Sequence, residues 1–176
     1  SGTLGGQLVD SRLAIIYTIS KMANRMSFLD VERIVRQRGL RIFSPLDLER
    51  LGRLSPVAAR FLVHRYANRG VLLKLRNGLY ALTDLPPSDL ALANRLYEPS
   101  YLSLEFALSY YHLIPETIYR LTSVTSRPTR TVVALEKTFE YHHLKHPAFT
   151  GYAPVIVGVE TVLIATPEKA LLDYLY

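Results

Sequence analysis

The sequence predicts an α+β fold, and two local patterns carry most of that prediction. The serine–proline pairs Ser44-Pro45 and Ser55-Pro56 each indicate the start of a helix, and Asn77-Gly78 between two apolar runs indicates a β-hairpin after them. Beyond residue 84 the chain shows two helical patterns, several short runs rich in β-branched and aromatic residues, and a last helical pattern. Two helices joined by a tight turn and followed by a hairpin are typical of a winged helix-turn-helix. We therefore expect that domain first and a mixed α/β C-terminal domain after it.

The length of 176 residues suits one large or two small domains, and we expect two. Residues 1–26 would form a leader or N-terminal helix, residues 27–83 the winged helix-turn-helix, and residues 84–176 the second domain. Residues 1–6 resemble a tag remnant or a flexible leader, and the amphipathic residues 9–26 either dock on the winged domain or mediate dimerisation.

Cysteine is absent from the sequence, which excludes disulfide frameworks and cysteine-based zinc sites. No apolar run approaches the roughly 18 residues needed to span a bilayer, and no signal peptide is recognisable. We therefore expect a cytoplasmic protein.

The first helix of the pair begins at an N-cap, Ser44, with proline at the first helical position and Asp47 three residues after the cap. Phe43 and Leu48 have the spacing of a hydrophobic staple. Gly52 ends this helix at the turn. Ser55 then opens the second helix, which runs to Arg69 before Gly70 supplies a left-handed cap.

The second helix has two distinct faces. One apolar stripe, expected to pack on the preceding helices, consists of Ala59, Leu62, Val63 and Tyr66. The opposite face holds Val57, Phe61, His64, Arg65 and Asn68, with Arg60 on its flank. Such a face is what a recognition helix presents to the DNA major groove.

Charge and turn chemistry predict a basic wing after this helix. Residues 71–75 and 79–82 flank Asn77-Gly78, which favours a two-residue type I′ turn. Residues 27–82 hold eleven Lys and Arg against four acids, a net charge of +7, whereas the rest of the chain carries −1. All net positive charge therefore lies in one segment, as expected of a phosphate-binding surface. The alternative is a solvated basic face without a partner.

These patterns predict a set of DNA-binding residues. Arg60 or Arg65 would fork onto guanine, and Val57 or Phe61 would contact a thymine methyl. His64 is expected at a phosphate or base edge, whereas Phe61 either contacts DNA or packs on a neighbouring domain or a second subunit. The full predicted set is Ser44, Arg53, Ser55, Val57, Arg60, Phe61, His64, Arg65, Asn68, Lys74, Arg76 and Asn77.

The second domain is expected to begin after a stiff, proline-containing break at residues 83–88. Helices are predicted at residues 88–97 and 103–111 and from residue 166 onward, the last with Leu171, Leu172 and Leu175 on one side and still unfinished at Tyr176. Strands are predicted at residues 119–125, 131–135, 139–144, 155–159 and 162–165. Tyr101, Tyr110, Tyr111 and Tyr119 form either an interaction surface or part of the core.

Five runs together carry a resemblance to a known family: residues 55–70, 75–82, 93–105, 111–116 and 165–173. In this order and spacing they resemble the AbiEi family of antitoxins from bacterial abortive-infection (type IV toxin–antitoxin) systems, over roughly residues 40–176. The resemblance implies a winged helix that represses the family's own operon through inverted repeats in double-stranded promoter DNA, which is compatible with a homodimer on DNA. It also implies an antitoxin-type second domain that counteracts a nucleotidyltransferase-like toxin, directly or indirectly. The family usually continues with further helices, so we expect residues 84–176 to be incomplete at their C-terminus.

An enzyme is the competing interpretation of the second domain. The residues Glu140, His142, His143 and His146 cluster in sequence but lack a recognised metal-ligand spacing. Glu168-Lys169 lacks the partnering aspartate of a metal-dependent nuclease. We therefore expect no catalytic residues, no metal and no cofactor. The alternatives are a DNA-modifying or nucleolytic enzyme targeted by the winged helix, or a plain transcriptional regulator without a toxin partner.

Overall fold

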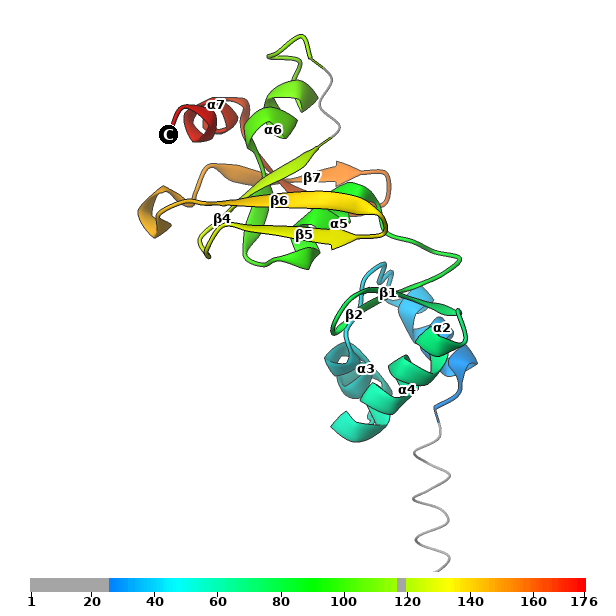
Figure 1. Ribbon diagram of the computed structural model, residues 1–176. Helices are drawn as coiled ribbons and strands as arrows, with labels where there is room; N and C mark the ends of the chain where they lie inside the picture. Colours follow the sequence, from blue (N-terminus) through cyan, green and yellow to red (C-terminus); the bar gives the residue numbers. More distant parts are fainter. Residues whose placement is uncertain (1–25, 117–119) are drawn as a thin grey trace, which may run out of the picture.

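The computed structural model describes residues 26–116 and 120–176 and has a mixed α+β architecture (Figure 1). Residues 26–85, here called the helix–hairpin unit, contain α2 (Phe28–Gln37), α3 (Pro45–Gly52), α4 (Pro56–Asn68), β1 (Leu72–Arg76) and β2 (Leu79–Leu82). Residues 88–116 and 120–176 are here called the sheet unit, and residues 86 and 87 connect the two units. Expectations for residues 1–25 and for Tyr119 fall outside the described residues. The division of the chain into domains at residues 83 and 84 stays a prediction.

The sheet unit combines six strands with three α-helices. Its elements are α5 (Asp89–Leu96), β3 (Ser100–Leu102), α6 (Leu104–Tyr110), β4 (Leu121–Thr125), β5 (Arg130–Ala134), β6 (Lys137–His143), a 3₁₀ turn η1 (His146–Ala148), β7 (Tyr152–Val157), β8 (Glu160–Ala165) and α7 (Pro167–Leu175).

Serine caps begin the helices of the helix–hairpin unit where the sequence predicts them. Ser44 forms a capping box with Asp47 at the start of α3, and the Ser55 side chain accepts a hydrogen bond from the Ala58 amide at the start of α4. The end of α3 at Gly52 is also confirmed, although the left-handed residue is Arg53, with φ 51°. Gly70 takes the predicted left-handed conformation after α4.

The predicted apolar stripe of α4 is confirmed. Ala59, Leu62, Val63 and Tyr66 are all buried, in a core with Val31 and Val35 of α2, Leu48 of α3 and three hairpin residues, Leu72, Tyr80 and Leu82. Because these positions recur every three to four residues, burying them leaves the opposite face of α4 to solvent.

The hairpin differs from the prediction at its turn. Of the pair Asn77-Gly78, only Gly78 has a positive φ (80°), whereas a type I′ turn requires positive values at both positions. The expected turn type is therefore wrong. The strand register shifts between Lys74 and Arg76, which marks a β-bulge. A bulge increases the right-handed twist of the two strands, so a type I′ turn is not needed to produce that twist.

Strand β2 is buried on both faces, because the hairpin lies between two cores. Tyr80 and Leu82 belong to the helical core, whereas Leu79 and Ala81 belong to the core of the sheet unit. Ile42 and Leu75 join the sheet-unit core from the same side. The hairpin is therefore a packed connection between the units.

The segment at residues 83–88 is anchored and does not act as a free spacer. Asp84 forms an ion pair with Arg36 of α2, Pro87 is buried, and the Ser88 amide donates to the Glu160 carboxylate at 2.9 Å. These contacts join α2 and β8 to the connecting segment.

The larger sheet is mixed, with strand order β5-β6-β4-β3-β8-β7. The pairs β3–β8 and β4–β6 are parallel and the other neighbours are antiparallel. Helices α6 and α7 pack together on one side, and α5 lies on the other (Figure 1). The five predicted strands correspond to β4–β8. The central strand β3 was missed, because three residues are too few to show a period-two pattern.

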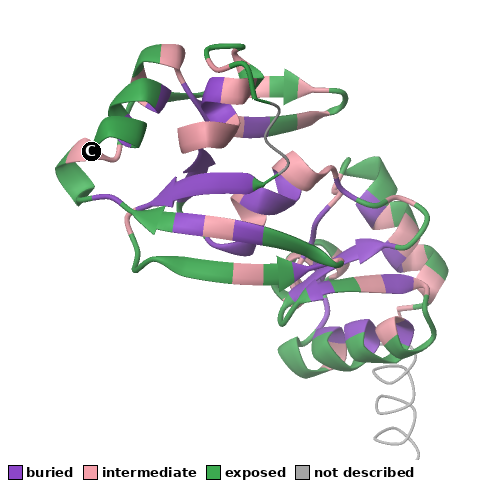
Figure 2. Ribbon diagram, turned by 45° about the horizontal axis from the view of Figure 1, so that its top comes forward, coloured by how far each residue is buried: buried purple, intermediate pink, exposed green. Residues whose placement is uncertain are grey.

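Burial follows this layering. Figure 2 shows buried residues gathered in the central strands and the hairpin, whereas the edge strands β5 and β7 are largely exposed. No helix in the described parts of the chain has the length and apolar character needed to cross a membrane.

Candidate nucleic-acid interface

The outer face of α4 presents every helix residue that the sequence singles out for DNA. Val57, Arg60, Phe61, His64, Arg65 and Asn68 are all exposed. Phe61 is 73% exposed and Val57 61%, and both are therefore far more accessible than large apolar side chains usually are. Among the described residues, Phe61 packs in neither core, so DNA and a second subunit remain of the partners that the sequence offered.

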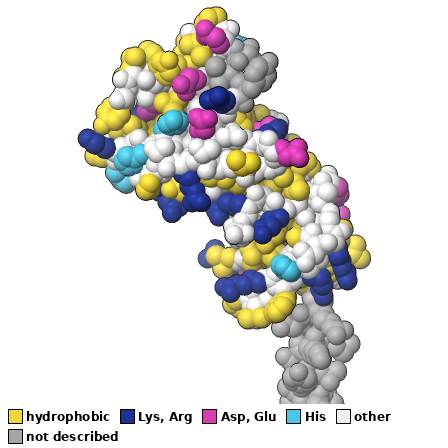
Figure 3. Space-filling view, viewed as in Figure 1, with side chains coloured by type: hydrophobic (Ala, Val, Ile, Leu, Met, Phe, Trp, Pro, Cys, Tyr) yellow, Lys and Arg dark blue, Asp and Glu magenta, His cyan; other side chains and the backbone are white. Residues whose placement is uncertain are grey.

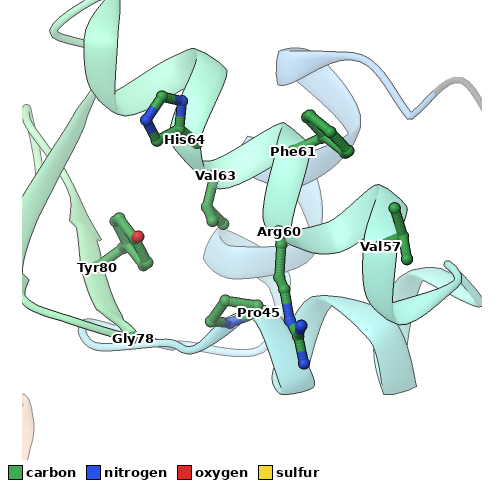
Figure 4. A pocket seen from close by; sticks show the side chains of 8 residues that line it. All are labelled: Pro45, Val57, Arg60, Phe61, Val63, His64, Gly78 and Tyr80. Carbon is green, nitrogen blue, oxygen red and sulfur yellow. The ribbon is translucent and has the colours of Figure 1, made fainter.

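A groove runs between α4 and the hairpin, with a volume of about 660 Å³. We call it the α4 groove. It is lined by Pro45, Val57, Arg60, Phe61, Val63, His64, Gly78 and Tyr80. Figure 4 shows Val63 between α4 and the Tyr80 ring, and Arg60 extending toward α3, whereas Phe61 and Val57 project on the side of α4 away from Tyr80.

Arg60 and Arg65 lie on opposite sides of the Phe61 ridge. Arg60 lines the α4 groove, whereas Arg65 lines a separate hollow with Met26 and Leu54. The Arg65 guanidinium carbon is 4.8 Å from the centre of the Tyr66 ring, and its Nη2 donates to Tyr66 Oη at 3.3 Å. The two arginines therefore lie on different flanks of α4, and contacts with Tyr66 hold Arg65 on its side.

The two basic residues of the hairpin also separate. Lys74 is opposite Tyr80 in the strand register, so it shares a face with the ring that lines the α4 groove. Arg76 and Asn77 instead line a pocket that faces the sheet unit. Of these two residues, only Lys74 therefore lies on the hairpin face that carries Tyr80, one of the residues that line the α4 groove.

The remaining predicted residues lie at helix ends. Ser44 uses its hydroxyl as both donor and acceptor toward Asp47, so its side chain is occupied by the capping box. Ser55 is exposed, and among the described residues its hydroxyl accepts one hydrogen bond and donates none, so its proton is available for a phosphate oxygen. Arg53 is exposed at the turn between α3 and α4.

Positive charge on α4 and the hairpin is not neutralised internally. Within the described residues, Arg33 and Arg36 of α2 form ion pairs with acids, whereas Arg60, Arg65 and Lys74 have no carboxylate within 4.0 Å. Figure 3 shows Lys and Arg side chains on the lower body and along the inner side of the bend where the two units meet. Unpaired cations on a convex helix face are suited to an extended polyanion.

The sheet unit shows neither of the catalytic arrangements weighed from the sequence. Glu140 Oε2 and His142 Nε2 are 3.8 Å apart on β6, and no group of three metal-binding side chains occurs among the described residues. Glu168 is exposed in the first turn of α7. Lys169 pairs instead with Asp173, with 2.6 Å between Nζ and Oδ1.

Asp173 is the centre of a buried polar cluster that sequence reasoning missed. Tyr101 Oη donates to its Oδ2 at 3.0 Å and Ser103 Oγ at 2.7 Å. Burial, and next the nearby Asp173 charge, raises the pKa of Tyr101. Because the Asp173 side chain is 1% exposed and Ser103 is fully buried, no substrate reaches them. The cluster joins α7 to β3 and has a structural role.

In comparisons with known proteins, no family model matches the chain, and no match is found among curated proteins.

Proposed function

We propose that residues 27–83 form a winged helix-turn-helix and that the protein is a DNA-binding transcriptional autorepressor. The observation that carries this proposal is the outer face of α4, which is exposed along its length and bordered by Arg60, Arg65 and Lys74, none of them paired with an acid. Helix α3 precedes α4 across a three-residue connection, and the hairpin follows α4 directly, as in winged helices.

In the proposed complex, α4 enters the major groove of promoter DNA. Val57, Phe61 and His64 form a central ridge that contacts the base edges. Arg60, on the flank of α4 that lines the α4 groove, is placed to donate a forked pair of hydrogen bonds to guanine. Arg65 borders the other edge of the ridge. Lys74 and the free Ser55 hydroxyl contact phosphates, which adds affinity without sequence preference.

We further propose an antitoxin role for the same protein, in the bacterial cytoplasm, against a nucleotidyltransferase-type toxin encoded in the same operon. This part rests on the resemblance of five separate runs to the AbiEi family. Three of those runs contribute the second half of α5 with β3, the segment that follows α6, and most of α7 to the sheet unit, which makes that unit the site of protection in this proposal. No catalytic group is needed for it.

The DNA proposal predicts steeply salt-dependent binding. Fluorescence anisotropy of a labelled duplex from the protein's own promoter should show affinity falling at least about 30-fold between roughly 50 and 200 mM salt, because at least about three phosphate contacts each release a counterion. An unrelated duplex of equal length should bind more weakly at every salt concentration. Equal affinity for both duplexes would contradict an operator-specific repressor.

A further inference from the structure

The second basic region of the molecule is a pocket between the hairpin tip and the sheet unit, with a volume of about 420 Å³. We call it the arginine pocket. Its lining consists of Arg76, Asn77, Leu96, Tyr97, Glu98, Arg127, Arg130 and Val132. Three guanidinium groups from three different segments therefore converge on one hollow.

No acid neutralises these three arginines. Within the described residues, Arg76, Arg127 and Arg130 have no carboxylate within 4.0 Å. The one acid of the lining, Glu98, pairs with Arg95 outside the pocket at 2.8 Å. Like charges gathered in one hollow repel, and an anion bound among them removes that repulsion.

Both arginines from the sheet unit are held in place. The guanidinium carbons of Arg127 and Arg130 are 4.8 and 5.5 Å from the centre of the same ring, that of Tyr97. Tyr97 is fixed by donating its hydroxyl to the Pro128 carbonyl at 3.2 Å, and Arg127 Nη1 donates to the Glu98 carbonyl at 3.1 Å. The donors are therefore ordered without a ligand, which lowers the entropic cost of binding one.

We propose that the arginine pocket binds a phosphate group. Planar guanidinium forks match phosphate oxygens in pairs, and the Asn77 side chain adds a neutral hydrogen-bonding group at the rim. Two sources share this chemistry: a phosphodiester of bound duplex DNA and the phosphate of a free small molecule. The first source rests on the proposed DNA-binding function and would make the sheet unit part of the DNA surface, whereas the second is independent of it.

The test uses the full chain with Arg127 and Arg130 both changed to glutamine. The control changes Arg120 and Lys145 to glutamine, which removes the same charge from exposed positions of the sheet unit. Each protein is titrated with the promoter duplex over a salt series, and separately with inorganic pyrophosphate by calorimetry. Thermal unfolding of all three proteins checks that the substitutions leave the fold intact.

For a DNA phosphodiester, we expect the slope of log affinity against log salt to become shallower by about 1 to 2 in the pocket variant and to be unchanged in the control. For a free phosphate, pyrophosphate binds the wild type and the control, and the pocket variant binds at least about 10-fold more weakly. If the wild type fails to bind DNA but binds pyrophosphate through these arginines, the inference stands and the proposed function fails. Unchanged DNA binding together with no pyrophosphate binding overturns the inference.

Discussion

Changing Arg60, Arg65 and Lys74 together to alanine should weaken binding to the promoter duplex at least about 100-fold at physiological salt. Loss of a guanine fork costs about 1 to 3 kcal/mol, and each lost phosphate contact reduces the salt slope by about 1. The fold should survive, because all three side chains are exposed and none forms an ion pair with another described residue. Anisotropy titrations and thermal unfolding measure both effects.

The matched control changes Arg120, Lys137 and Lys145 of the sheet unit to alanine. It removes the same charge and should weaken DNA binding only a few-fold, through the long-range field. In bacteria that express the toxin proposed for the same operon, the Arg60, Arg65 and Lys74 variant should still protect growth. If the folded variant loses protection together with DNA binding, the proposed division between the two units is wrong.

Asp173→Ala should cost about 3 to 5 kcal/mol of the free energy of unfolding, because removing the carboxylate leaves Tyr101, Ser103 and Lys169 with buried polar groups and no shared partner. The matched control is Asp89→Ala, which removes an exposed carboxylate paired with Lys137 and should cost at most about 1 kcal/mol. Urea unfolding followed by circular dichroism compares the two variants. Equal losses would contradict the structural role of the Asp173 cluster.

The same cluster predicts a loss of stability at alkaline pH. Tyr101 has its pKa raised in the folded protein, so its contribution is complete below the ordinary tyrosine pKa of about 10 and declines above it as the unfolded chain ionises.

Local signals in the sequence predict the bounds of α3, α4 and the two hairpin strands closely, whereas the bounds of α2 were not predicted. The Ser44 and Ser55 caps act on amides within the next three residues, and the α4 stripe needs only its own periodicity, so neither depends on distant parts of the chain. The position of the turn at Asn77-Gly78 was predicted, but its type was wrong. The bulge between Lys74 and Arg76 changed which type of turn the strands require.

Two features that sequence reasoning missed, the Asp173 cluster and the arginine pocket, are non-local. Asp173 meets Tyr101 and Ser103 across about 70 residues of chain, and no spacing rule links them. In the sequence, Arg127-Pro128 indicates only a turn. Arg127 lines the same pocket as Arg76 because the hairpin packs on the sheet unit. The sequence could have predicted that Arg60 and Arg65 lie on different flanks of the helix, because five residues along an α-helix correspond to about 140° of rotation.

Position 61 gives the sharpest test of α4 as the DNA-reading helix, because Phe61 is 73% exposed on the proposed recognition ridge. The sequence offered DNA, a neighbouring domain or a second subunit as its partner, and the exposure of Phe61 leaves DNA or a second copy. A photoreactive benzophenone amino acid in place of Phe61 keeps an aromatic side chain there, and the same probe in place of Leu172 on α7 is the control. After irradiation with the promoter duplex, we expect a covalent protein–DNA adduct from position 61 and none from position 172. A cross-link from position 61 to a second copy of the protein, with no DNA adduct, would contradict α4 as the DNA-reading helix.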